Sequence, residues 1–440
     1  MIEKLRKAGL GYNVNDSETT DKFGQIPMRH LVYRVQALPQ SLLPLVWDFG
    51  TLRAAPPLPN GEPQAGDVET AYIRQMIVKF NSASMAGLGG IHFGNHTPVV
   101  AEILSMTQAF MRLQEDECSF VSLRDVQRLL DVTNWFYSQR DYIFSAMEGD
   151  QIVEESSDDE DDEDREEEEL PLFMPNRDYT TRSLVLALAV CYIARLEEDT
   201  REQYIEYIAP KIGELMGRDD IEAQYFIRDE IDRCQNMFIN EVVNTDVHKN
   251  IAKNKALKEN VFMMIVCIEN RIPLFLVGKP GSSKSLSKAM VVDAMKGGSS
   301  HSDFFKNLKR TYMVSFQCSR YATPSGIVGV FKQCANFQEG QDLEKFVSVV
   351  VLDEVGLAED SENMPLKTLH PLLEDGCEDS SVTPEPYMKC AFVGISNWAL
   401  DPAKMNRGIF VQRGTPKPLE LEQIAKYLLL KTCEVLLLLG

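Results

Sequence analysis

The sequence has no Cys-x-x-Cys pair among its nine cysteines, and several of them lie inside apolar runs. Disulfide frameworks and zinc sites usually show regular cysteine spacing, so these cysteines are predicted to be reduced core residues of a cytoplasmic protein. The six histidines are scattered, and only His92 and His96 fall close together, in a glycine-rich segment. A helix is not expected there, so a plain loop is favoured over a metal site.

Long apolar runs and an excess of basic residues are also absent. The first ten residues are charged rather than apolar, which argues against a secretory signal. The leucine-rich run 428–439 is interrupted by Lys431 and Glu434 and is too short to span a bilayer. No transmembrane segment is therefore expected. The 45 basic residues are outnumbered by 66 acidic ones, and this balance argues against nucleic acid as a general ligand.

Much of the acidic excess lies in one segment. Residues 154–169 hold thirteen acidic residues and one arginine, and so supply −12 of the net charge of −21. Such a segment cannot bury apolar area and its charges repel one another, which predicts a disordered surface loop at 151–170. Two hypotheses remain for this loop: a solvated spacer, which is favoured, or a site for a basic partner.

The hydrophobic pattern divides the remaining sequence into two kinds of structure. Apolar residues recur at helical spacing through much of 71–142 and again through 178–244, after a strand-like segment at 30–35. From residue 250 onward, short apolar strands alternate with helical segments. This alternation predicts an α/β fold with a doubly wound parallel sheet, preceded by a mainly helical region.

The clearest motif follows the first of these strands. The residues of the motif are Gly278, Lys279, Pro280, Gly281, Ser282, Ser283, Lys284 and Ser285. A strand that turns sharply into a helix directs backbone amides and the positive end of the helix dipole at the turn, which favours phosphate. Lys284 would reach the β and γ oxygens of a nucleotide triphosphate, and Ser285 would bind Mg²⁺. Ser283 stands where glycine is usual, so a residue with a Cβ must adopt the tight turn. The alternative is a simple glycine-serine turn before a helix.

A second motif ends the apolar strand that starts near Val347. Asp353 would hold Mg²⁺ through water, and Glu354 would polarise the attacking water for phosphoryl transfer. A surface turn is the alternative, and the upstream phosphate loop makes it much less favoured. The two motifs together predict ATP and Mg²⁺ as ligands.

Two further residues complete the candidate site. Asn397 ends an apolar strand that is predicted to lie between the two motif strands, where its amide would orient the water. Viewed alone, it is equally compatible with a simple turn at the strand end. Arg407 precedes the last strand and either points into a neighbouring nucleotide site as an arginine finger or is an ordinary exposed loop arginine.

The order of these motifs resembles the AAA+ ATPases, and four strings are closer to one family. GKPGSSKS at 278–285, VVLDEVGLAE at 350–359, LHPLLEDG at 369–376 and ISNWALDPAKMNR at 395–407 resemble the mysterin family, which are giant RING-finger E3 ubiquitin ligases with dynein-like AAA modules. The similarity covers most of residues 25–426, apart from the acidic loop.

The resemblance implies a division of the chain. Residues 1–150 would be the closing strand and helical lid of a preceding AAA module, and 171–245 its helical continuation. Residues 246–440 would be the large α/β subdomain of the next module, without its own lid. Arg124 and Arg407 would then serve the preceding module's site, so little ATP turnover is expected from this chain alone.

The resemblance also implies partners and location. The partners would be neighbouring AAA modules of the same polypeptide, and the ubiquitin machinery through regions outside this chain, because no zinc-spaced RING set is present. A cytoplasmic location with lipid droplet association is implied as well. Three hypotheses follow: a hydrolysing AAA+ segment of an E3 ligase, a scaffold locked by ATP, and a midasin-like or MoxR-like remodelling ATPase without ligase activity.

Overall fold

The computed structural model describes residues 12–14, 31–33, 66–86, 90–114, 121–154, 178–243, 251–359, 361–377, 383–414 and 425. The predictions for the leucine-rich run 428–439 and for 155–170 lie outside these residues. In the described part no helix combines the length and apolarity that crossing a bilayer requires.

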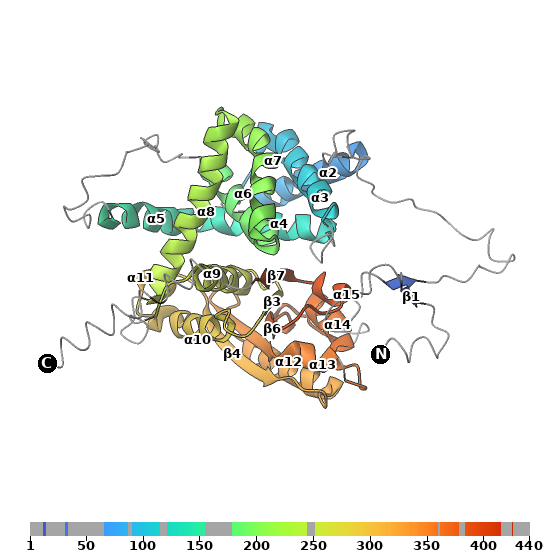
Figure 1. Cartoon of the computed structure of the whole chain (residues 1–440). Helices are drawn as coiled ribbons and strands as arrows, with labels where there is room; N and C mark the ends of the chain where they lie inside the picture. The colour runs from blue at the N-terminus through green and yellow to red at the C-terminus, as the bar shows by residue number, and fades with distance from the viewer. Residues whose placement is uncertain are drawn as a thin grey trace, which may run out of the picture.

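The described structure has a helical layer above an α/β layer (Figure 1). The helical layer consists of α2 (Asp67–Ala86), α3 (Thr97–Arg112), α4 (Leu123–Ser138), α5 (Arg140–Glu154), α6 (Tyr179–Cys191), α7 (Glu198–Met216) and α8 (Asp220–Val243). Before it, β1 (Tyr12–Val14) pairs antiparallel with β2 (Leu31–Tyr33). The helical prediction for this half is therefore confirmed.

Two boundaries in this half differ from the predictions. The apolar spacing over 122–142 predicts one helix. The structure has two helices there, because α4 ends at Ser138 and α5 begins at Arg140. Helix α5 also continues through Glu154. The first four residues of the predicted acidic loop are therefore helical, and the loop prediction is wrong for them. The reason is that residues 151–153 precede the dense charge run and extend the helical pattern of α5.

The α/β layer is built on five parallel strands in the order β4-β5-β6-β3-β7. Their bounds are β3 (Leu274–Gly278), β4 (Arg310–Gln317), β5 (Phe346–Asp353), β6 (Ala391–Ser396) and β7 (Ile409–Arg413). Strand β6 lies between β3 and β5, as predicted. The apolar pattern predicts this strand over 388–396. Strand β6 is shorter, because residues 386–388 form a 3₁₀ turn started by Pro386, which has no N–H to give to a ladder.

Helices cover both faces of this sheet. On the face toward the helical layer lie α9 (Lys255–Glu269) and α10 (Lys284–Ala294), with α11 (Asp303–Lys306) beside them (Figure 1). On the other face lie α12 (Pro324–Gln338), α13 (Val355–Glu359) and α14 (Leu369–Glu374), and α15 (Pro402–Met405) precedes β7. The sequence pattern predicts one helix near 364–373. The structure has a 3₁₀ turn over 365–368 followed by α14.

Alternate residues of each strand separate the two cores. Val349 and Val351 join the large cluster that includes the helical layer, whereas Val350 and Leu352 pack with α12, α13 and α14. This is the period-two alternation of a strand buried on both faces. One continuous hydrophobic cluster therefore joins the helical layer to the sheet, and it fixes where the carboxyl ends of the strands lie.

Candidate nucleotide-binding site

The phosphate-loop motif forms the turn between β3 and α10. Its strand is fully buried, and α10 begins at Lys284. Gly281 has a φ of +90°, and Ser283 has a φ of +58° in the left-handed region. Ser283, which carries a Cβ, thus takes up the tight turn, as the sequence predicts. A non-glycine residue in that region is strained, typically by about 1 kcal/mol or more.

The first turn of α10 has no side-chain cap, because Ser283 at the N-cap accepts no bond from it. Helices α9 and α12 are capped by the side chains of Asn254 and Thr323. The first amides of α10 have no partners within the helix, and they face the loop. They are thus available to an anionic ligand.

Lys284 folds back over the loop. Its ammonium donates to the carbonyl oxygens of Gly278 and Lys279 and, at 3.0 Å, to Ser282 Oγ. Burial lowers the pKa of the Lys284 ammonium, and the charge of Asp353 partly offsets this effect. The loop carbonyls therefore hold a cation that an incoming phosphate can attract.

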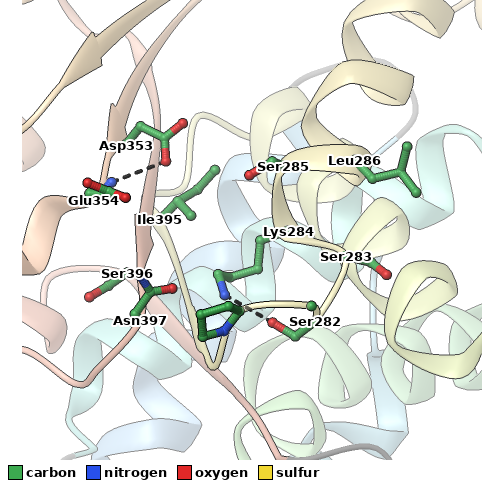
Figure 2. Close-up of a pocket in the computed structure, with 12 residues that line it drawn as sticks. Ser282, Ser283, Lys284, Ser285, Leu286, Asp353, Glu354, Ile395, Ser396 and Asn397 are labelled. Atoms are coloured by element: carbon green, nitrogen blue, oxygen red, sulfur yellow. Dashed lines mark hydrogen bonds between the residues drawn. The ribbon is translucent and has the colours of Figure 1, made fainter. Parts of the chain in front are cut away.

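A pocket of about 440 Å³ lies against this loop. Figure 2 shows Lys284 and Ser285 on one side of it and Asp353, Glu354 and Asn397 on the other. The structure therefore brings the predicted metal-binding and water-activating side chains to one pocket with residues 280–285 of the phosphate-loop motif, whereas Gly278 and Lys279 of that motif do not line it. Pro280, Ser282, Ile395 and Ser396 complete the lining with their neighbours.

Asp353 and Glu354 leave strand β5 in different conformations. Asp353 ends the strand, and its Oδ1 accepts the amide N–H of Glu354 at 3.1 Å. Glu354 has a φ of +52°, so the chain bends sharply where the strand ends. Strained residues of this kind are concentrated at functional sites.

The pocket fits a magnesium-bound triphosphate by the chemistry of its donors. Ser285 and Asp353 offer hydroxyl and carboxylate oxygens, the hard ligands that Mg²⁺ prefers in sites it shares with phosphates. A cation already stands at Asp353, because Lys288 Nζ lies 3.1 Å from its Oδ2. The site therefore attracts positive charge at the acids and negative charge at the loop.

Comparison with known proteins agrees with this geometry. Residues 250–420 match the RNF213 AAA domain family. The chain is similar to the E3 ubiquitin-protein ligase RNF213 of Homo sapiens, with 50% identity over 97% of the chain, and to that of Mus musculus, with 49% identity over 97%. The E3 ubiquitin-protein ligase rnf213-beta of Danio rerio is 47% identical over the same share.

The chain belongs to the mysterin family. It spans about 7% of the length of the curated relatives that it matches. It is thus similar to one segment of a much larger multidomain polypeptide.

Arg407 lies outside the pocket of this mysterin-family segment. Its guanidinium forms an ion pair with the Glu374 carboxylate, and 18% of its side-chain surface is exposed to solvent. Arg407 is therefore a half-buried, ion-paired arginine rather than a freely exposed one, and its role as an arginine finger stays a prediction. Arg124 of α4 also reaches Glu374, at 2.7 Å. The two arginines that the resemblance linked to a preceding module thus meet at one carboxylate.

The sequence analysis missed Gln317, whose Nε2 donates to Glu354 Oε2 at 3.0 Å. Gln317 is the last residue of β4 and pairs in register with Asp353. The sequence could have indicated Gln317, because it is a polar residue at the end of a strand, and the ends of neighbouring parallel strands meet at one edge of the sheet.

A buried network behind the loop was also missed. Arg413 pairs in register with Gly278 and donates to Asn260 Oδ1 at 2.7 Å and to Glu259. Asn260 donates in turn to the Ser282 carbonyl at 3.0 Å. Arg201 of α7 donates to the same Glu259 at 2.7 Å. The helical layer is thus connected to the phosphate loop by buried polar contacts.

The two arginines dominate the charge of Glu259. Burial alone would raise its pKa, but Arg413 and Arg201 outweigh burial and lower the pKa to about 2. The carboxylate therefore stays ionised throughout the ordinary pH range.

Among the described residues, Cys318 carries a neutral thiol near the paired acids. Burial, with the charges of Asp353 and Glu354, raises the pKa of the Cys318 thiol to about 12. Six of the seven cysteines in the described ranges are buried: Cys191, Cys234, Cys267, Cys318, Cys334 and Cys390. A neutral thiol is a poor nucleophile.

Proposed function

We propose that this chain binds ATP with Mg²⁺ in the pocket between the phosphate loop and the paired acids, and that it supplies an ATPase segment to an E3 ubiquitin ligase. The observation that carries the proposal is the convergence of Lys284, Ser285, Asp353, Glu354 and Asn397 on one pocket. Three separate strands bring these residues together, which a chance turn would not do.

The residues divide the work by their chemistry. Backbone N–H groups of 281–285 and the Lys284 ammonium would bind the phosphates, and Ser285 and Asp353 would hold the metal. When bound, Mg²⁺ would neutralise the charge that develops on the phosphate oxygens. Glu354 would accept the proton of the attacking water at a carboxylate oxygen, and the Asn397 amide would orient that water.

Turnover by the chain alone is expected to be weak. Arg407 is held by Glu374 outside the pocket, so the pocket receives no finger from the described residues of its own chain. We infer that a following module would provide it. Neighbouring AAA modules would therefore be the first partners, and ubiquitin transfer would depend on regions of the polypeptide beyond this segment. Cytoplasmic location and lipid droplet association remain proposals from the family.

Titration calorimetry with ATP and Mg²⁺ tests the binding. We expect Lys284→Ala to weaken ATP binding by about 100-fold, because it removes a charged contact to the phosphates, roughly 3 kcal/mol. Lys306→Ala removes a surface lysine of α11 and is the matched control. Equal ATP affinity in wild type and the Lys284 variant would show that the phosphate loop does not bind ATP.

Hydrolysis is tested in a longer protein that extends through the next module. Glu354→Gln should retain ATP and lose phosphate release. Unchanged release in that variant would exclude Glu354 as the base.

A scaffold locked by ATP is a second candidate, favoured by the strained Ser283. The phosphate loop keeps Ser283 in a strained backbone conformation, and a loop of this kind can release bound ATP slowly. ATP retained through purification, with no phosphate release from the longer protein, would support it. A remodelling ATPase without a ligase is a weaker candidate, because the relatives reported above are named as ubiquitin ligases.

A further inference from the structure

Lys288 forms an ion pair with one of the two acids of the site. Its Nζ lies 3.1 Å from Asp353 Oδ2, and 21% of each side chain's surface is exposed to solvent. Lys288 stands on α10 one helical turn after Lys284, and it does not line the pocket itself. The pair connects the phosphate-loop helix to the end of strand β5.

The two oxygens of Asp353 are engaged by different groups. Oδ1 accepts the Glu354 amide, whereas Oδ2 accepts the Lys288 ammonium. The ammonium of Lys284 points instead to the loop carbonyls of Gly278 and Lys279. The second lysine of the helix, rather than the phosphate-binding one, is therefore the direct counter-ion of this carboxylate.

A lysine at this position has a consequence for metal binding. The carboxylate oxygen that Lys288 occupies is one that a magnesium ion would use, directly or through water. An ammonium and a divalent cation at the same oxygen repel each other, and the low effective dielectric of a half-buried site strengthens that repulsion.

We propose that Lys288 is a built-in counter-ion of Asp353 that competes with Mg²⁺ for Oδ2 and so sets the metal requirement of nucleotide binding. This inference rests on the proposed Mg²⁺-ATP site. Lys288 acts through Asp353 and is a positioning residue. Metal entry requires the ammonium to release the carboxylate, and metal loss lets it return.

The sign of the effect separates this role from a structural one. If Lys288 competes with the metal, Lys288→Met strengthens metal binding. If Lys288 only holds Asp353 in place, the same change loosens the ligand and weakens metal binding. Lys288→Arg keeps a cation at the carboxylate and should behave like wild type.

The test uses the 440-residue chain saturated with ATP, with Mg²⁺ titrated by calorimetry. We expect Lys288→Met to lower the Mg²⁺ concentration at half-saturation by about tenfold, equivalent to about 1.4 kcal/mol. Lys296→Met is the matched control, because Lys296 lies just beyond the same helix and pairs with Asp293 rather than with Asp353. Thermal unfolding midpoints check that each variant folds.

An unchanged or weakened Mg²⁺ midpoint in a folded Lys288→Met protein overturns the proposal. Weaker ATP binding with no change in metal dependence also overturns it, because Lys288 would then contact phosphate.

A second measurement uses Mn²⁺ alone, followed by electron paramagnetic resonance. We expect Lys288→Met to bind Mn²⁺ more tightly than wild type without nucleotide, and Lys288→Met with Asp353→Asn to lose that gain. If the wild-type chain binds no ATP, the proposed function fails. The Mn²⁺ measurement still tests whether Lys288 competes with a metal ion at Asp353. No gain in Mn²⁺ binding would then reject the counter-ion role.

Discussion

Gln317 holds the carboxylate of Glu354 through a hydrogen bond of 3.0 Å between Nε2 and Oε2. This bond holds the carboxylate in one orientation and occupies Oε2, an oxygen that could otherwise accept the proton of the attacking water. We therefore expect Gln317→Leu to raise ATP hydrolysis several-fold in the longer protein, with ATP affinity unchanged. Phosphate release at saturating ATP measures it. Gln333→Leu, on the exposed side of α12, is the control, and equal rates in both variants would contradict the role of the bond.

Ser283 lies in the left-handed region at the tight turn of the phosphate loop. Glycine adopts that conformation without strain, so Ser283→Gly should stabilise the folded chain by about 1 kcal/mol. Gly281→Ala is the opposite change, at a φ of +90°, and should destabilise it by a similar amount. Urea unfolding compares the two. A loss of stability in Ser283→Gly would mean that the loop is not strained.

Glu259 is buried between Arg201 and Arg413. Glu259→Gln leaves two cations without their shared carboxylate, and we expect a loss of about 3 kcal/mol in the free energy of unfolding. Glu198→Gln breaks the exposed pair with Lys255 and should cost less than about 1 kcal/mol. Similar losses in both variants would show that the buried network is not what connects the helical layer to the loop.

The pH dependence follows from the same residue. The pKa of Glu259 is lowered to about 2 in the folded chain, from an ordinary value near 4.5. Its stabilising effect is therefore complete above about pH 4.5 and is lost as the pH falls through 2; the difference is about 3 kcal/mol. Acid unfolding should show the gap between wild type and Glu259→Gln closing over that range. A gap that stays constant down to pH 2 would contradict the low pKa.

Arg407 pairs with Glu374 outside the pocket. Arg407→Ala should leave ATP binding at the Lys284 loop unchanged within about twofold, because no contact with that loop is lost. In a longer protein that includes the preceding module, the same change should lower that module's hydrolysis, since an arginine finger can contribute about 10³-fold to the rate. Loss of binding at the Lys284 loop would place Arg407 in this site instead.

The sequence by itself determined the fold class, the phosphate loop and the paired acids. Each is a local pattern: an apolar strand, a turn of fixed residue types and a helix start within about a dozen residues. Because parallel strands place their carboxyl ends at one edge, strand order alone was enough to bring Lys284, Asp353 and Asn397 together.

Only the tertiary structure decided which polar groups are partners. Lys288 meets Asp353 across 65 residues of sequence, and Arg413 meets Glu259 across 154. It also showed that Arg124 and Arg407 share Glu374, and that the helical layer and the sheet share one hydrophobic cluster. Such pairs depend on how helices pack on the sheet, which is set by the sum of many weak apolar contacts and leaves no local pattern in the sequence.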